Sequence, residues 1–324
     1  MVDTLDRPLD TLVVAGSNGA GKTSFLEAIL FGLGQERLIV RGVPEGEQRS
    51  FMRHRFPTDA IVDLTFSLDG APGETLRYAR DAGRFRVRRE GPDGAREEID
   101  LHDLADLPAH LAALPGELQI EEPRYFSSWR APALVGALAP SIGGSVEPTE
   151  ANRVAALKQR IINLAARSAF GRSSTAVDVL LARLNKAWSY FHVTDGTHIA
   201  PDVVDPDDEK TALFDLYVLN RDGSRRCAID DVSAGELELI AMAGELMVDD
   251  KPRLVLVDEP ELHLHPEWVS QIKRALRSFA PGAQFILSTH ADAPWDQASS
   301  YERLLLGPLD DPRVALQYRD VTRR

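Results

Sequence analysis

A phosphate-binding loop is indicated by residues 16–23, which read GSNGAGKT and match the pattern G-x-x-x-x-G-K-[ST]. Glycines let the backbone curl so that its N–H groups point at phosphate oxygens, and a helix that follows adds its positive N-terminal end. In such loops the lysine reaches the β- and γ-phosphates and the threonine hydroxyl binds Mg²⁺. The alternative is an ordinary glycine-rich turn, which the flanking strand and helix patterns disfavour. We predict that ATP is bound here, by Gly16, Ser17, Asn18, Gly19, Ala20, Gly21, Lys22, Thr23 and Ser24.

A second group of candidate residues stands at 254–259, where four apolar residues precede two acids (LVLVDE). This pattern fits a buried parallel strand whose C-terminal end carries the chemistry. Two adjacent carboxylates repel each other unless a cation lies beside them. We predict that Asp258 holds Mg²⁺, directly or through water, as Thr23 does, and that Glu259 polarises the attacking water as a base or an orienting group. The alternative is a strand that runs into an acidic turn.

Two further motifs lie in the last third of the chain. Ser288, Thr289 and His290 follow the apolar strand 284–287, and His290 could contact a γ-phosphate or the attacking water. Residues 233–236 (SAGE) fit a capping box, in which Ser233 and Glu236 each bond the other's backbone N–H at the start of a helix. A helix N-terminus with Ser233 and Gly235 is also an anion site for a nucleotide held by another subunit. Both interpretations of this segment can hold together.

Hydrophobic periodicity predicts the elements that must position these residues. An apolar strand and a helix flank the loop, and three alternating strands form an antiparallel patch after that helix. Two apolar stripes predict a helical pair, and an Arg-Asp-Gly turn predicts a hairpin. The expected strands are 11–16, 60–68, 75–80, 84–89, one within 118–129, 212–219, 226–230, 253–258, 284–288, 303–307 and 313–318; the expected helices are 25–34, two within 150–190, 233–247 and 266–279, with an acidic loop at 202–209.

Composition narrows the class of protein. The chain has 324 residues, of which 44% are hydrophobic, and a formal net charge of −13. The single cysteine, Cys227, excludes an intrachain disulfide and any multi-cysteine zinc site. The acidic N-terminus does not resemble a signal peptide, and no stretch approaches the roughly 20 apolar residues of a membrane span. We therefore expect a cytoplasmic protein without membrane contact.

The negative charge argues against a surface coated for nucleic-acid binding, but a local basic face stays open. Arg84, Arg86 and Arg88 alternate with Phe85 and Val87, so on a strand the arginines share one face. That face is either an ordinary solvated surface or a strip that faces phosphate or DNA.

The order of these motifs resembles that of the ABC ATPase class, in which SAGE corresponds to the signature motif. The stretch 258–266, DEPELHLHP, is similar to the soluble AAA_15/AAA_21-type ATPases. Those are related to the overcoming-lysogenization-defect and RecF-like proteins, and more distantly to the heads of structural-maintenance-of-chromosomes (SMC) proteins. The resemblance covers mainly residues 12–34 and 230–292.

The resemblance implies an α/β P-loop NTPase fold of the ABC ATPase type, with a mixed central sheet, an antiparallel β patch and a helical lid insertion. Residues 1–140 would form the N-terminal part of the ATPase domain, 141–200 the lid and 201–324 the C-terminal part. The implied catalytic residues are Glu259, His290 and Lys22, and the implied nucleotide contacts from the opposite protomer are Ser233, Gly235 and Glu236. Residues 261–265 would form the D-loop at a dimer interface. No glutamine stands at the expected Q-loop, where Ser127, Ser128, Arg130 or Gln119 could substitute.

The implied function is that of an ATPase that dimerises head to tail around ATP and separates after hydrolysis. Relatives of this type serve DNA repair or anti-phage defence, often with a nuclease. The chain after His290 is too short for a nuclease domain, so we expect any nuclease to be a separate protein, and DNA contact stays open. The alternatives are a transporter nucleotide-binding subunit and an ATP-dependent regulatory scaffold.

Overall fold

The computed structural model describes residues 9–314 except 42, 58, 69–72, 82, 103, 105–106, 129–135, 142–152, 170–174, 206–212, 249–252 and 309, and it describes the backbone alone at 95–96, 169 and 248. The chain forms two compact units. The larger consists of Met1–Ala15 and Phe126–Arg324, and the smaller is Gly16–Tyr125. The boundaries predicted at residues 140 and 200 stay a prediction.

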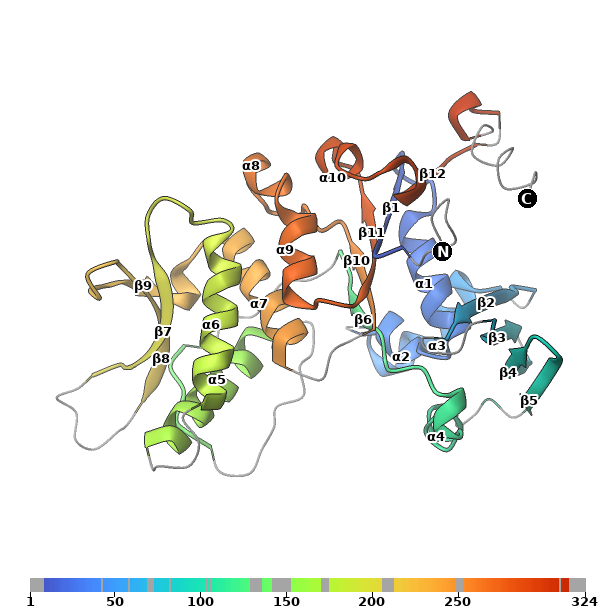
Figure 1. Cartoon of the computed structure of the whole chain (residues 1–324), viewed down its shortest axis with the longest axis horizontal. Coiled ribbons are helices and arrows are strands. Elements are labelled where there is room, and N and C mark those ends of the chain that lie inside the picture. Colours follow the sequence, from blue (N-terminus) through green and yellow to red (C-terminus); the bar gives the residue numbers. More distant parts are fainter. Residues whose placement is uncertain are drawn as a thin grey trace. The chain divides into compact units, whose positions relative to one another are not determined.

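A five-stranded sheet forms the centre of the larger unit (Figure 1), and the strand from the start of the chain lies between strands from its end. β1 and β10 each pair in parallel with β11, so their carboxyl ends lie at one edge. Every residue of β10 is buried, which explains its unbroken apolar run. In spatial order the strands are β12 (Arg303–Leu306), β1 (Thr11–Gly16), β11 (Gln284–Thr289), β10 (Leu254–Asp258) and β6 (Arg124–Phe126).

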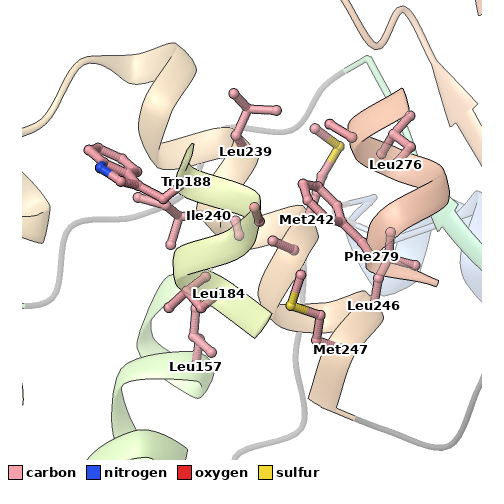
Figure 2. Packing of buried hydrophobic residues seen from close by; sticks show 14 of the residues in the cluster. Leu157, Leu184, Trp188, Leu239, Ile240, Met242, Leu246, Met247, Leu276 and Phe279 are labelled. Atoms are coloured by element: carbon pink, nitrogen blue, oxygen red, sulfur yellow. The ribbon is translucent and has the colours of Figure 1, made fainter. Parts of the chain in front are cut away.

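Helices and strands share one apolar core in this unit. The central helix α7 (Ala234–Val248) is buried along nearly its whole described length and contacts α5 (Arg153–Ala169), α6 (Thr175–Ser189) and α9 (Ile272–Phe279). Figure 2 shows Met242 and Leu246 of α7 among side chains from the neighbouring helices, including Leu184 and Phe279. Gly244 permits close packing, because a Cβ atom there would lie 2.7 Å from a methyl carbon of Leu157.

A three-stranded antiparallel sheet adjoins these helices in the order β7 (His198–Val203), β8 (Phe214–Leu219), β9 (Arg225–Ala228). The 3₁₀ turn η2 (Ile229–Asp231) follows it. The fully buried ammonium group of Lys158, on α5, lies 2.6 Å from an Asp215 oxygen and 2.8 Å from an Asp230 oxygen. A buried cation with two carboxylate partners ties the helix to both segments.

The smaller unit begins with the phosphate-binding loop and a helix that packs on a four-stranded antiparallel sheet. Gly32, at the end of α1, lies against this sheet so closely that a Cβ atom would be 2.6 Å from a Val62 methyl carbon. The guanidinium group of Arg80 lies 4.1 Å from the ring centre of Phe31 and donates to the Phe31 carbonyl oxygen. The elements are α1 (Lys22–Gly32), α2 (Glu36–Ile39), α3 (Glu45–Arg55), β2 (Val62–Ser67), β3 (Thr75–Asp81), β4 (Arg84–Gly91), β5 (Gly94–Leu101), α4 (Leu107–Ala112) and η1 (Gly116–Leu118).

The basic strip on β4 is opposed by acids. Arg84 forms a bidentate pair with Asp100, and Arg88 lies 3.0 Å from Glu90. Asp100 also has a lowered pKa, because it accepts a hydrogen bond from Arg84. The Arg84–Asp100 pair joins β4 to β5, and the Arg88–Glu90 pair lies within β4. Ion pairs between such neighbouring side chains are typical of a solvated sheet face. This geometry favours the first of the two interpretations that the sequence left open.

The predicted α/β class, with its central sheet, antiparallel patch and helical insertion, is confirmed. Four local predictions are wrong. Residues 229–230, expected at the end of a strand, lie in the 3₁₀ turn η2. The helix expected at 266–279 is divided into α8 (Pro266–Val269) and α9, and the Ser270 carbonyl oxygen at the break accepts a hydrogen bond from Gln297. Residues 202–203, expected in a loop, end β7, because they pair with β8. Residues 312–314 are helical rather than a strand, and 315–318 lie outside the described residues.

The chain's remaining short elements are α10 (Asp292–Asp296) and η3 (Ser300–Glu302). Among the described residues, no helix has the length and apolarity needed to cross a bilayer.

Candidate functional site

The predicted phosphate-binding loop leads from β1 into α1 and closes around its own lysine. The Lys22 ammonium group donates to the carbonyl oxygens of Gly16 and Ser17, at 3.0 and 3.1 Å, and the residue is 5% exposed. A backbone hydrogen bond from Ala20 to Ser17 (3.1 Å) tightens the turn. The lysine therefore lies at the mouth of the loop, where its charge would meet a phosphate.

The two inner glycines of the loop have backbone angles that suit glycine. Gly19 has a φ of 78° and Gly21, which caps α1, a φ of 91°. A Cβ atom at either position would meet nothing within 4 Å, so conformation and not crowding requires glycine there. Thr23 and Ser24 follow in the first turn of α1. The loop thus has the form of the anion cradle that its sequence predicts.

The register between β10 and β11 places an acidic residue and a serine side by side at the edge of the sheet. Asp258, at the end of β10, pairs with Ser288 on β11, and the Ser288 hydroxyl donates to an Asp258 carboxylate oxygen. Asp258 is 1% exposed. A carboxylate held by a hydroxyl at a strand end is suited to orient a hard cation such as Mg²⁺, which prefers oxygen ligands. The sequence motif singled out Ser288 without a role, and the structure supplies one.

Glu259 turns away from the strand and faces His290. Its backbone has a φ of 51°, the left-handed region, and its N–H donates to the Ser288 carbonyl oxygen at 2.9 Å. One Glu259 carboxylate oxygen lies 2.9 Å from His290 Nε2, and both side chains are partly exposed, at 27% and 35%. A carboxylate and an imidazole in contact, accessible at the end of a buried strand, can share and move the proton of a water molecule.

Glu261 holds the segment that carries His290. One of its carboxylate oxygens accepts hydrogen bonds from the Thr289 hydroxyl (2.7 Å), the His290 N–H (2.7 Å) and the Ala291 N–H (3.2 Å). Three donors on one carboxylate oxygen make a rigid attachment. Glu261 lay in the predicted D-loop, and its role was not visible because all three donors come from another segment.

The signature segment, residues 233–236, forms the predicted capping box at the start of α7. The Ser233 N–H donates to the Glu236 carboxylate at 2.7 Å, and the Glu236 N–H donates to the Ser233 hydroxyl oxygen at 3.4 Å. Burial alone would raise the pKa of Glu236, but its contact with His192 and its bonds from Ser233 lower that pKa to about 2. The carboxylate is therefore ionised at neutral pH.

The larger unit brings the signature segment against residues 261–265 of the same chain, the predicted D-loop. A Cβ atom at Gly235 would lie 2.5 Å from the carbonyl oxygen of His263, whose own φ is 63°. The larger unit also brings Asp258, Glu259 and His290 to one sheet edge. Residues 16–24 belong to the smaller unit, whereas Asp258 and Glu259 belong to the larger unit.

Sequence reasoning missed His192, whose Nε2 lies 2.9 Å from the Glu236 carboxylate. No local pattern connects the two, because they belong to different helical segments. Gln119, one candidate for the missing Q-loop residue, donates to the carbonyl oxygens of Leu114 (2.6 Å) and Ala112 (3.3 Å) and so serves its own turn. Ser127 and Ser128 follow β6, and Arg130 lies outside the described residues.

Known proteins resemble parts of this chain. Residues 150–293 match the family described as AAA domain, putative AbiEii toxin, Type IV TA system. The chain is 34% identical over 113 residues to the retron Vc95 probable ATPase of Vibrio cholerae serotype O1 biovar El Tor, which covers 31% of this chain and 22% of that protein. It is 35% identical over 71 residues to the Septu protein PtuA of Bacillus thuringiensis, covering 22% and 18%.

The chain therefore spans less than a quarter of the length of these two relatives. Among solved structures it is similar to an SMC head bound to the C-winged helix domain of ScpA, with a TM-score of 0.49 and 15% identity over 90% of this chain and 86% of that one. It is also similar to an SMC head domain from Thermotoga maritima, with a TM-score of 0.42 and 15% identity over 89% and 82%.

Proposed function

Since this chain belongs to the ABC-like ATPases of the AAA_15/AAA_21 type, we propose that it binds ATP with Mg²⁺ and hydrolyses it. The phosphate-binding loop, residues 16–24, holds the triphosphate through its N–H groups and Lys22. Thr23 and Asp258 would supply oxygen ligands to the metal ion, which when bound would neutralise charge on the phosphates. The division of oxygen ligands between a helix start and a strand end is the arrangement that P-loop enzymes use.

The hydrolytic step rests on one observation, the 2.9 Å contact between the Glu259 carboxylate and His290 Nε2. Glu259 accepts a proton from the attacking water as the water oxygen bonds to the γ-phosphorus and the bond to the β-phosphate oxygen breaks. His290 holds Glu259 in position and contacts the phosphate oxygens. The bonds from Glu261 to the backbone of residues 290 and 291 keep the imidazole at this place.

Hydrolysis requires a second copy of the chain, because one protomer contacts only one side of the γ-phosphate. The signature segment offers Ser233 and the N–H groups at the start of α7, a fifteen-residue helix, to the nucleotide of the other protomer. ATP then joins two protomers head to tail, and its hydrolysis releases them.

We further propose that the chain is the ATPase subunit of a bacterial anti-phage defence system and works with a separate effector protein such as a nuclease. The likeness to a retron ATPase and to a Septu protein supports this role over one in DNA repair. The ion-paired β4 face gives no support for DNA contact through that strand.

The test replaces the proposed base. Glu259→Gln should bind ATP, fail to hydrolyse it and form a stable dimer with ATP and Mg²⁺, measured by light scattering after size exclusion. Lys22→Ala should abolish the heat of ATP binding in calorimetry and remain monomeric. A Glu259→Gln protein that binds ATP and stays monomeric contradicts the dimer switch, and ATP heat that persists in Lys22→Ala contradicts the nucleotide site itself.

A further inference from the structure

The signature segment contains an electrostatic conflict. Glu236 is ionised, with a pKa of about 2, and it stands in the first turn of α7, where the proposed function places the γ-phosphate of the partner's ATP. Its carboxylate caps the Ser233 N–H at 2.7 Å, so it cannot move away without opening the capping box. The Glu236 carboxylate and a phosphate bound at this helix start would repel each other unless a cation compensates one of the two negative charges.

The capping box leaves Ser233 able to contact a phosphate. Its hydroxyl oxygen accepts the Glu236 N–H, and a hydroxyl has one proton to donate besides the bonds it accepts. The geometry of the segment therefore suits phosphate binding, and only its charge opposes it.

His192, just after α6, stands against this carboxylate. Its Nε2 lies 2.9 Å from one Glu236 oxygen, and its Nδ1 lies 3.2 Å from an Asp195 oxygen. Both ring nitrogens thus lie within ion-pair distance of a carboxylate, an arrangement that suits an imidazolium ion, which carries a proton on each nitrogen. The side chain is 10% exposed, so solvent screens these contacts little.

The ring is also fixed in orientation by its neighbours. It stacks on Trp188 with ring centres 3.9 Å apart and meets the edge of Trp268. Asp195 is itself held by Arg226 (3.0 Å) and by the Thr197 hydroxyl (2.9 Å). The network runs from the helical insertion and the three-stranded sheet to the signature segment. An imidazolium packed against indole rings is stabilised further by its contact with their π electrons.

We propose that His192 is a positioning residue of the trans nucleotide site, whose positive charge neutralises Glu236 and so allows the signature segment to receive the γ-phosphate of the partner's ATP. This inference rests on the proposed function, since it presupposes that Ser233 and Gly235 contact that phosphate. It assigns to the helical insertion a direct part in nucleotide-driven dimerisation.

The experiment compares variants in the Glu259→Gln background, in which ATP should hold the dimer. We expect His192→Gln to weaken ATP-dependent dimerisation by about tenfold or more, which corresponds to about 1.4 kcal/mol. Its Lys22-dependent heat of ATP binding to the monomer should not change. Glu236→Gln keeps a capping side chain and removes the charge, so adding His192→Gln to it should change dimerisation by less than about threefold. His54→Gln, at an exposed helix end, is the matched control.

Each outcome decides the matter. Dimerisation of His192→Gln at the parent level overturns the role of the histidine and leaves the dimer switch intact. A second result is that His192→Gln reduces dimerisation equally in the presence and absence of Glu236→Gln, and a third is that it unfolds the protein in a way that the double variant does not restore. Either result shows that the packing of the ring matters and its charge does not, and so overturns the proposed role of His192. A parent that binds ATP and remains monomeric overturns both the switch and this inference.

Discussion

The carbonyl oxygen of His263 occupies the place where a side chain at position 235 would begin, since a Cβ atom on Gly235 would lie 2.5 Å from it. The signature segment and the D-loop of one chain are therefore in backbone contact. In a head-to-tail dimer the first would meet the partner's nucleotide, and the second begins two residues after Glu259. If one segment shifts, the other has to move with it, because the two backbones are packed too closely to leave free space between them.

Gly235→Ala tests this contact. We expect a loss of about 1–3 kcal/mol in the free energy of unfolding, because the added methyl group forces the two backbones apart. ATP-dependent dimerisation should fall with it. Urea titration gives the first quantity and light scattering with ATP the second.

The control for this substitution is Gly46→Ala in α3, where a Cβ atom meets nothing within 4 Å. That change should leave stability equal or higher, since alanine suits a helix interior better than glycine. A Gly235→Ala protein as stable as the parent, with normal dimerisation, contradicts the contact.

Glu261→Ala should separate chemistry from binding. Without the carboxylate, the segment around His290 loses three hydrogen bonds, two from backbone N–H groups and one from the Thr289 hydroxyl, and the imidazole drifts from Glu259. We expect kcat to fall by about 10- to 100-fold, because small misplacements of catalytic groups are costly, with little change in KM for ATP. Steady-state phosphate release measures both.

Glu261→Gln retains a carbonyl oxygen that can accept the same three bonds, so it should lose much less activity. The exposed Glu267 provides a second control, because Glu267→Ala removes a carboxylate nearby without touching this attachment. Equal effects of Glu261→Ala and Glu261→Gln argue against an anchoring role.

Acid should weaken the larger unit through the signature segment. The pKa of Glu236 falls from 4.5 to about 2 on folding, and that of Asp195 from 3.8 to about 2. Because the folded-state pKa is the lower one, the stabilisation is present above the unfolded-state value and is lost as pH falls from about 4.5 towards 2. Urea titrations between pH of about 6 and about 3 should show this loss, and Glu236→Gln should reduce its slope. An unchanged slope contradicts the coupling of Glu236 to folding.

Local chemistry made much of this site predictable from the sequence. The loop at 16–23 needs glycine at particular backbone angles and a lysine near its end. These residues are neighbours in the sequence, so the motif can be recognised without the structure. The strand 254–258 is predicted by an apolar run that ends at two acidic residues. The capping box is equally local, because Ser233 and Glu236 bond across a single helical turn.

The other features of the site depend on contacts between residues that are far apart in the sequence, which the spacing of residues does not predict. His192 meets Glu236 only because α6 packs beside α7, and Gly235 meets His263 only because the chain turns back after β10. The break between α8 and α9 was missed for a similar reason. Residues 266–279 have helical periodicity, and the side chain of Gln297, which bonds the Ser270 carbonyl oxygen, comes from beyond the next strand.

The place of β1 in the central sheet has a consequence for synthesis. β1 is synthesised before the strand that it pairs with, β11, which is made some 270 residues later. The nascent chain must carry an apolar strand without its neighbour while the residues between them are made, a delay that slows folding and exposes the strand to aggregation. A recombinant fragment limited to residues 150–293 would lack that central strand and leave one edge of β11 open to pairing with other molecules.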